Sequence, residues 1–355
     1  MSSAKLAEAL ARMGESERVR RVAIALLRRY ERIARHPGSV RDDITGPLVE
    51  ALHAHVDVAR KSLRSGLVFD FRPRGRITRE FLLSTPAVPD HVWEPQTTRL
   101  LLHLARSARH VLIGGAYFGD HALPIAQQIA AGGGVVHAFE PNARNVALLA
   151  HNAELNKLAN VRAHRKGLWE RTARLKLADQ DEDALAGSAE LAPGDANDAD
   201  AFDAVSMDDY AATLDGPVGL VMLDIEGGKL SALRGARGLL SRPGPTAPHL
   251  VFEVHSEYVD WSRGLHRTEI VEYVASMGYE VYAVRDAHAN VDLHGHPIEL
   301  IPAARTYLEG PPHGFNMLGV KDAALVRTDL FRIRPDVSPK YLFHKDPALF
   351  HPLAP

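Results

Sequence analysis

Hydrophobic positions between residues 110 and 320 fall into short β-branched runs that alternate with stretches of helical spacing. The runs predict strands at 110–114, 134–139, 161–164, 218–224, 249–254, 279–284 and 315–320. Between them, apolar residues recur every three or four positions and predict helices at 120–131, 142–156, 206–213, 228–240 and 265–277. Strands alternating with helices predict an α/β fold, a mostly parallel seven-stranded sheet with helices on both faces.

Two segments depart from this alternation. The last strand, 315–320, follows a loop rich in proline and glycine and no helix precedes it, so we expect it to enter the sheet antiparallel. Residues 179–204 are rich in Asp, Ala and Gly and predict a loop, interpreted as a lid over the ligand edge of the sheet.

The N-terminal pattern is different. Residues 4–35 carry an apolar stripe at helical spacing with arginines on the other face, and residues 47–64 predict a second helix with Pro47 in its first turn. We therefore expect a helical N-terminal extension over residues 1–80, a ligand-binding domain over 81–325 and a C-terminal tail over 326–355.

Composition narrows the function classes. The chain has no cysteine, which excludes disulfides, thiolate zinc sites and a cysteine nucleophile. It has no apolar run of membrane-spanning length, and residues 1–11 lack the apolar core of a signal peptide, so we expect a cytoplasmic protein without a membrane partner. The formal net charge of −2 gives no indication of a nucleic-acid partner.

The charge is unevenly placed. Residues 1–79 hold 17 Lys and Arg against 9 Asp and Glu, whereas residues 179–215 hold 12 Asp and Glu and no Lys or Arg. Two interpretations stay open: two solvated surfaces, or a basic N-terminal part that docks on the acidic segment within one chain or between two. The basic helices are accordingly a candidate homodimer surface.

The ends of the first two strands carry the motifs of a nucleoside-containing cofactor. The first strand ends in a turn of mostly small residues, Gly114, Gly115, Ala116, Tyr117, Phe118 and Gly119, with Asp120 after it. Glycine lets the backbone lie close to a ligand, and the following helix start offers free amides to a carboxylate. The second strand ends in Glu140, Pro141 and Asn142, where an acid can accept both ribose hydroxyls.

This geometry serves NAD and S-adenosylmethionine, and one residue favours the second. Ala116 stands where the dinucleotide motif G-x-G-x-x-G needs its second glycine. Later strand ends carry Asp224 and Glu253, where a methyl acceptor would lie. The sequence thus favours an S-adenosylmethionine-dependent methyltransferase, with an NAD-dependent oxidoreductase as an alternative.

These motifs resemble those of the FkbM-type methyltransferases over residues 93–320. The matching segments are 93–95, 114–119, 138–142, 151–156, 221–227, 250–254 and 315–320. The resemblance implies a Rossmann-like fold, S-adenosylmethionine as cofactor, and O-methylation of a hydroxyl on a small metabolite or sugar, as in secondary metabolism. It also indicates Gly167 and Trp169, after the third strand, as neighbours of the adenine; a buried core role for Trp169 is the alternative.

Two positions depart from the family pattern. Ile113 stands where family members usually carry an acid that helps hold the methionine ammonium, so Asp120 or Glu94 is expected to substitute. Lys229 stands in place of a family acid. These departures motivate a second alternative, a catalytically degenerate methyltransferase-like module that acts in assembly.

Acceptor chemistry is expected at the strand ends. Methylation of a neutral hydroxyl requires a base, and the candidates are Asp224, Glu226, Glu253 and His255. His255 is the leading base because its ordinary pKa is near neutral; a helix-capping Asp224 and a purely structural His255 are the competing interpretations. Asp224, Glu253 and His255 are also a candidate Mg²⁺ or Mn²⁺ site.

The remaining histidine-rich segment receives a structural interpretation. His288, His294 and His296 lie in a turn-rich stretch and predict a surface loop, not a metal site.

Overall fold

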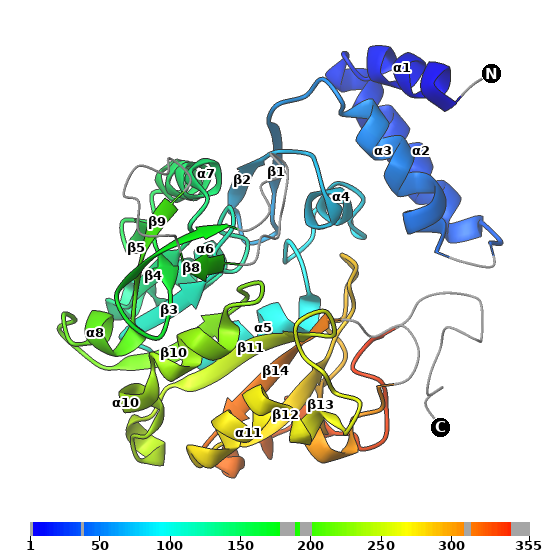
Figure 1. The fold of residues 1–355 in the computed structure, drawn as a ribbon. Helices are drawn as coiled ribbons and strands as arrows, with labels where there is room; N and C mark the ends of the chain where they lie inside the picture. The colour runs from blue at the N-terminus through cyan, green and yellow to red at the C-terminus, as the bar shows by residue number, and fades with distance from the viewer. Residues whose placement is uncertain (1–2, 37–38, 178–188, 192–200, 309–313, 342–355) are drawn as a thin grey trace.

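The computed structural model describes residues 3–36, 39–177, 189–191, 201–308 and 314–341. Within them, a nine-stranded sheet forms the centre of the molecule (Figure 1). Its strands are β3 (His110–Gly114), β4 (Val135–Phe139), β5 (Val161–His164), β10 (Val218–Leu223), β11 (His249–His255), β12 (Glu280–Arg285), β13 (Ile298–Pro302), β14 (Gly314–Val320) and β15 (Phe331–Ile333).

The strand order is β15-β13-β12-β14-β11-β10-β3-β4-β5. Strands β3, β4, β5, β10 and β11 pair in parallel, and β14 enters antiparallel between β11 and β12, as predicted. All seven predicted strands are present. The two strands that were not predicted, β13 and β15, extend the edge beside β12.

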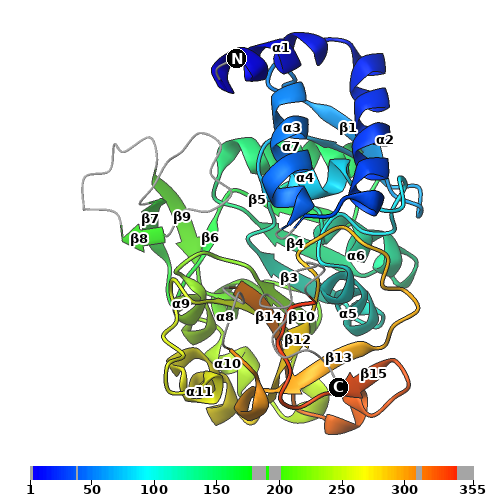
Figure 2. The same cartoon turned by 90° about the vertical axis from the view of Figure 1, so that its right-hand side faces the viewer.

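Alternation along the strands builds one apolar core on each face of the sheet. In β3, Val111 and Ile113 join one core and Leu112 joins the other, and β10 divides its side chains in the same way. The first core is covered by α5 (Pro95–Ala105), α6 (Ala122–Ile129) and α7 (Ala143–Leu155). The second is covered by α8 (Met207–Ala211), α9 (Lys229–Arg234), α10 (Arg237–Leu240) and α11 (Glu269–Ser276) (Figure 2).

Short 3₁₀ turns connect these elements: η2 (Ala130–Gly132), η3 (Gly244–Thr246), η4 (Leu265–Arg267), η5 (Ala303–Arg305) and η6 (Ala323–Val326). The predicted helix 228–240 is interrupted between α9 and α10. At Gly235 a Cβ atom would lie 2.1 Å from the carbonyl oxygen of Trp169, so the chain bends where the two backbones meet.

The loop prediction for residues 179–204 is wrong for its described part. Strands β8 (Ala189–Leu191) and β9 (Ala201–Val205) join β6 (Gly167–Leu168) and β7 (Ala173–Leu177) in a second sheet of order β6-β9-β7-β8. Small and acidic residues hid these strands, because the alternation that marks a strand is reduced to Phe202 and Ala204 in β9. Most of the predicted lid lies outside the described residues.

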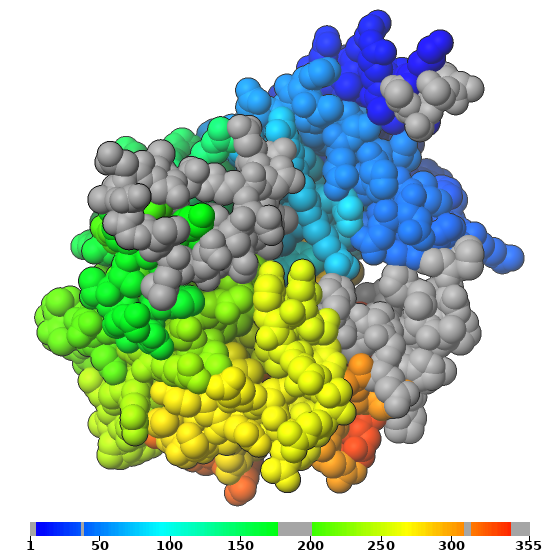
Figure 3. All heavy atoms as spheres, in the orientation of Figure 1, coloured from blue at the N-terminus to red at the C-terminus, as the bar shows by residue number. Residues whose placement is uncertain are grey.

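The prediction of helices in the N-terminal region is correct, but the prediction that residues 1–80 are helical throughout is wrong. The region contains α1 (Ser3–Met13), α2 (Glu17–Ile33), a π-helical turn η1 (Arg41–Thr45), α3 (Gly46–Leu52), the hairpin strands β1 (Ala59–Ser62) and β2 (Val68–Phe71), and α4 (Arg76–Leu82). Residues 1–80 are therefore not purely helical. The predicted single helix breaks at Gly14, where a Cβ would lie 1.8 Å from the Leu52 carbonyl oxygen. The first helices form a protruding corner (Figure 3).

Asn152 of α7 and Asn156, the C-cap residue of that helix, attach the hairpin to the central domain. The Asn152 side chain accepts from the Asp70 amide at 2.9 Å and donates to the Asp70 and Phe118 carbonyl oxygens at 2.9 and 3.0 Å. Asn156 makes the same pair of bonds to the amide and carbonyl of Val68, at 2.8 and 2.7 Å. These amides supply the hydrogen bonds that a neighbouring strand would give to β2.

The predicted C-terminal tail also belongs to the fold in its described part. Strand β15 pairs with β13, and the chain then runs beside the end of β12, where the Asp286 amide donates to the Pro339 carbonyl at 2.9 Å. The Lys340 side chain is thereby buried. None of the described helices is long and apolar enough to span a membrane.

Candidate functional site

The carboxyl ends of β3, β4, β10 and β11 lie at one edge of the sheet, where open α/β sheets bind ligands. The turn after β3 approaches β10 closely. Gly115 has a φ of +76°, and a Cβ there would lie 1.8 Å from the carbonyl oxygen of Asp224. Gly119 has a φ of +97°, and the non-glycine residue Tyr117 has a φ of 44°. A turn in this conformation exposes its backbone to a ligand at the strand ends.

Glu140 lies beside this turn, at the end of β4. Its Oε2 accepts from the Tyr117 amide at 2.9 Å and its Oε1 from the Asn142 amide at 3.0 Å. Burial raises the pKa of Glu140 to about 7, although both amides favour the ionised form. Asn142 caps α7 through its side chain, which explains the asparagine after Pro141. The Asn145 side chain also forms a hydrogen bond with this carboxylate, so a ribose with two hydroxyls would take the place of Asn145 on one oxygen.

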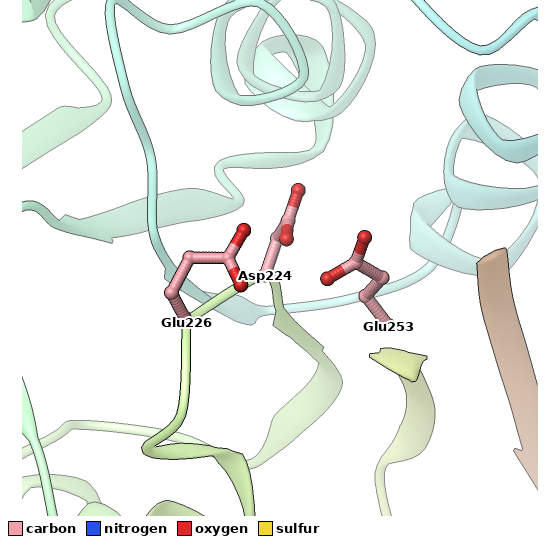
Figure 4. A group of neighbouring side chains, drawn as sticks. All are labelled: Asp224, Glu226 and Glu253. Atoms are coloured by element: carbon pink, nitrogen blue, oxygen red, sulfur yellow. The ribbon is translucent and has the colours of Figure 1, made fainter. Parts of the chain in front are cut away.

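Three carboxylates converge at the ends of β10 and β11 (Figure 4). One oxygen from each of Asp224, Glu226 and Glu253 lies within 4.8 Å of the others. Burial, followed by the charge of Glu253, raises the pKa of Asp224 well above its ordinary value. Burial also raises the pKa of Glu226. Both shifts favour the neutral form of these carboxyl groups more than in an exposed carboxylate.

Lys229 reaches into this acid group from the start of α9. Its Nζ lies 2.5 Å from Glu253 Oε2, and the side chain is buried. Burial opposes the charged ammonium, but Glu253, Asp224 and Glu226 outweigh it and raise the pKa of Lys229. Lys229, which departs from the family pattern, thus supplies a positive charge to the group of Asp224, Glu226 and Glu253.

His255 lies on the same face of β11 as Glu253, as predicted, since a Cβ on Gly314 would be 2.6 Å from His255 Cδ2 and 2.9 Å from Glu253 Oε1. It does not belong to the acid group that could hold a metal ion among the described residues. Its Nδ1 accepts from the Glu257 amide at 3.1 Å, so the proton of the neutral ring is on Nε2 and the basic nitrogen is already used. The predicted metal set of Asp224, Glu253 and His255 is therefore corrected to Asp224, Glu226 and Glu253.

A small cavity of about 260 Å³ adjoins the acid group. It is lined by Gly227, Lys229, Leu230, His255, Tyr258, Val259, Asp260, Glu269 and Ile270. The Tyr258 side chain forms a hydrogen bond with Glu226, and Glu226 Oε2 has no partner among the described residues. The lining of the cavity is thus mixed, because Lys229, Asp260 and Glu269 are charged whereas Leu230, Val259 and Ile270 are apolar.

Glu94 and Asp120, the two acids expected to substitute for the one missing at Ile113, both lie near His121. Ile113 is buried in the first core, whereas His121 Nε2 lies 3.9 Å from both Glu94 Oε2 and Asp120 Oδ2. Burial raises the pKa of Asp120. Glu94 has a φ of 47°, an unfavourable conformation for this residue type, which places its carboxylate in the site.

The two residues expected near the adenine lie beside the second sheet. Gly167 is in β6, against the Phe202 ring. Trp169 is half-buried, packs on the Leu175–Phe202–Ala204 cluster, and would be 3.2 Å from a Cβ on Gly228. Trp169 thus supports the contact between the second sheet and α9, and the adenine contact stays a prediction.

The sequence did not indicate a second group of site residues. His288 was expected in a surface loop, yet its Nε2 lies 3.4 Å from Glu94 Oε1. Asn316 Nδ2 donates to Glu94 Oε2 at 2.6 Å, and Lys340 Nζ contacts both ring nitrogens of His288. Asn316 was within a matching motif, whereas Lys340 stands in a stretch that carried no signal.

Several solved structures resemble this chain, all at low sequence identity. The methyltransferase FkbM of Methylobacillus flagellatus KT is 17% identical with a TM-score of 0.36, and the match covers 60% of this chain but only 44% of that protein. An O-methyltransferase of Bacillus cereus in complex with SAH is 14% identical with a TM-score of 0.36, covering 70% and 92% of the two chains. TomG, a Streptomyces achromogenes O-methyltransferase in complex with SAM, is 14% identical with a TM-score of 0.34, covering 64% and 79%.

No curated protein matches the sequence. The family model of the methyltransferase FkbM domain matches residues 114–281, which hold the glycine turn, Glu140 and the acid group. The sheet order and the antiparallel β14 are those of a Rossmann-like methyltransferase. Residues 114–281 are thus similar to the methyltransferase FkbM domain, in agreement with the resemblance of the strand-end motifs.

Proposed function

We propose that this protein is an S-adenosylmethionine-dependent methyltransferase that methylates a hydroxyl group of a small molecule, such as a metabolite or a sugar. The observation that carries the proposal is Glu140, fixed by two backbone amides beside a glycine turn that has no room for a Cβ at Gly115. This arrangement fits a ribose with two free hydroxyls. When bound, the cofactor supplies a methyl group on a positively charged sulfur.

The acceptor is proposed to enter the cavity beside the acid group. A volume of about 260 Å³ suits a single ring or a short polar chain. Glu226 is the proposed proton acceptor, because burial brings its pKa closer to neutral and its Oε2 is unpartnered among the described residues. Lys229 neutralises Glu253 beside it, so that the two glutamates differ in role.

A divalent metal does not fit the acid group as it stands. The oxygen donors are close enough together, but the Lys229 ammonium already contacts Glu253 and would repel a second cation. The proposed reaction accordingly uses no Mg²⁺, and we expect EDTA to leave turnover unchanged. A requirement for added Mg²⁺ would contradict this part of the proposal.

The cofactor is tested by thermal unfolding with S-adenosylhomocysteine and, separately, with NAD. At about 100 times its dissociation constant, a ligand stabilises the folded state by about 2.7 kcal/mol, so the melting temperature should rise with S-adenosylhomocysteine only. A rise with NAD alone would favour the oxidoreductase. Binding without transfer of radiolabelled methyl to any of a panel of sugars and small alcohols would favour the degenerate module.

Once an acceptor is found, two matched variants separate the candidate bases. Glu226→Gln removes the proposed proton acceptor without changing its shape, and kcat should fall by about 10²- to 10⁴-fold. His255→Gln is the control, and it should retain most of the turnover because its basic nitrogen already binds the Glu257 amide. The reverse order of effects would restore His255 as the base.

A further inference from the structure

The outer face of helix α2 (Glu17–Ile33) carries large apolar side chains that are exposed. The helix lies on the protruding corner of the molecule (Figures 1 and 3). Its apolar row consists of four residues, with exposed fractions of 55% for Val22, 63% for Leu26, 41% for Tyr30 and 72% for Ile33. Single exposed apolar side chains are ordinary, but a continuous row of them marks a surface that contacts a partner.

The inner face of α2 already attaches the helix to the rest of the protein. Ile24 packs in the first core, and Arg28 donates to the Leu82 carbonyl oxygen at 2.6 Å. Glu31 pairs with Arg41 at 2.6 Å. The apolar row is therefore not the face that packs on the fold, and a partner can contact it while α2 stays in place.

Arginines lie beside the apolar row. At about 100° per residue, the row spans an arc of about 80° around the helix. The adjoining arc, also about 80° wide, holds four exposed arginines: Arg18, Arg21, Arg29 and Arg32. Arg21 forms an exposed ion pair with Glu17 at 3.6 Å, whereas the other three form none with the described residues. One half of the outer face is thus apolar and the other half is positively charged.

This arrangement indicates the chemistry of the partner, which must offer apolar groups beside negative charge. A membrane surface with anionic lipids offers acyl chains and phosphates side by side. A second copy of the chain fits less well, because a two-fold interface would bring two rows of arginines together. The acidic segment 179–215 also fits less well, since its first part, residues 179–200, has only Leu185 and Leu191 as large apolar residues to cover the row.

We propose that α2 binds to the surface of membranes that contain anionic lipids. The apolar row inserts at the boundary between headgroups and acyl chains, and the four arginines contact lipid phosphates. A helix that lies in the plane of the membrane needs no spanning run. The expectation of no membrane partner rested on the absence of such a run and does not address this kind of contact. The proposal is independent of the proposed function.

Vesicle sedimentation of the full-length protein tests the proposal. The protein should sediment with vesicles of phosphatidylcholine and about one third phosphatidylserine, and far less with phosphatidylcholine alone, because each arginine near an anionic surface strengthens binding about fivefold. The double variant Leu26→Ser with Ile33→Ser should weaken binding at least about 10-fold. The double variant Arg29→Gln with Arg32→Gln should weaken it about 25-fold.

Two matched variants serve as controls. Val58→Ser with Val88→Ser removes apolar side chains of similar exposure elsewhere on the surface, and Arg106→Gln with Arg332→Gln removes exposed arginines elsewhere. Both controls should bind vesicles like the wild type. All four variants change exposed residues and should unfold in urea within about 0.5 M of the wild type.

Three outcomes overturn the proposal. The first is equal sedimentation with both kinds of vesicle, or with neither. The second is a loss in the control variants as large as the loss in the α2 variants. The third is a dimer that forms in sedimentation velocity without lipid and disappears in Leu26→Ser with Ile33→Ser, which would assign the apolar row to a second copy of the chain.

Discussion

The pH dependence of nucleoside binding follows directly from the surroundings of Glu140. Burial raises the pKa of this carboxyl group to about 7 in the ligand-free protein. Two ribose hydroxyls are best accepted by the ionised carboxylate, so binding favours the deprotonated form. The affinity for the nucleoside should therefore be highest above pH 7 and should decrease as the pH falls below 7.

The magnitude follows from the ionised fraction. With a pKa of about 7, Glu140 is about nine tenths ionised at pH 8 and about one tenth at pH 6. The apparent affinity should therefore fall about tenfold between these two values, or about 1.4 kcal/mol. Because 5′-methylthioadenosine lacks the amino-acid end, its affinity reports on Glu140 without the carboxylates around Glu94.

The assay is isothermal titration calorimetry with 5′-methylthioadenosine at pH 6, 7 and 8, in buffers of different ionisation enthalpy. These buffers reveal the proton that Glu140 releases on binding near pH 7. Glu140→Gln should bind weakly and with no pH dependence in this range. Equal wild-type affinity at pH 6 and 8, or the same tenfold change in the Gln variant, would refute the reasoning.

Further predictions concern the ion pair and the asparagine contacts. Lys229→Met leaves Glu253 without its cation, so the free energy of unfolding measured in urea should fall by about 2 kcal/mol at pH 8, and by less at pH 6 where the carboxylates can protonate. An equal loss at both pH values would contradict the assigned charges. Asn152→Ala removes three hydrogen bonds and should cost about 3 kcal/mol. The exposed Glu154→Ala on the same helix should cost less than about 0.5 kcal/mol, and equal costs would show that the asparagine contacts contribute little.

The central sheet could be predicted because its strands are short apolar runs buried on both faces, and the pattern of residues such as Val111 and Leu112 is strong. Glu140 could be predicted because its role depends only on its place after the second strand. The hairpin strands β1 and β2 were missed, since β1 alternates between half-buried and exposed polar residues and lacks a hydrophobic run.

Residues that act through tertiary contacts could not be predicted in the same way. Lys340 is more than 200 residues from Glu94 in the chain, and tertiary contacts such as the backbone pairing with Asp286 bring it to the site. The prediction that His255 is the base rested on the ordinary pKa of histidine. Whether His255 can accept a proton depends instead on the hydrogen bond that its Nδ1 accepts from the Glu257 amide. In the sequence, Lys229 marked only the loss of a family acid. In the structure its ammonium group pairs with the Glu253 carboxylate.

The asparagine contacts of α7 extend further than the attachment of a hairpin. Asn152 binds both β2 and the carbonyl of Phe118, a residue of the glycine turn, and the Phe118 ring packs edge-on against Phe69 at 5.9 Å. Hydrogen exchange of the β2 amides should therefore slow when a ligand orders the turn, although no ligand touches β2. Local opening of the glycine turn should therefore be coupled to local opening of the β1–β2 hairpin. A domain that begins after residue 80 lacks the hairpin, so its glycine turn should be less ordered around the cofactor.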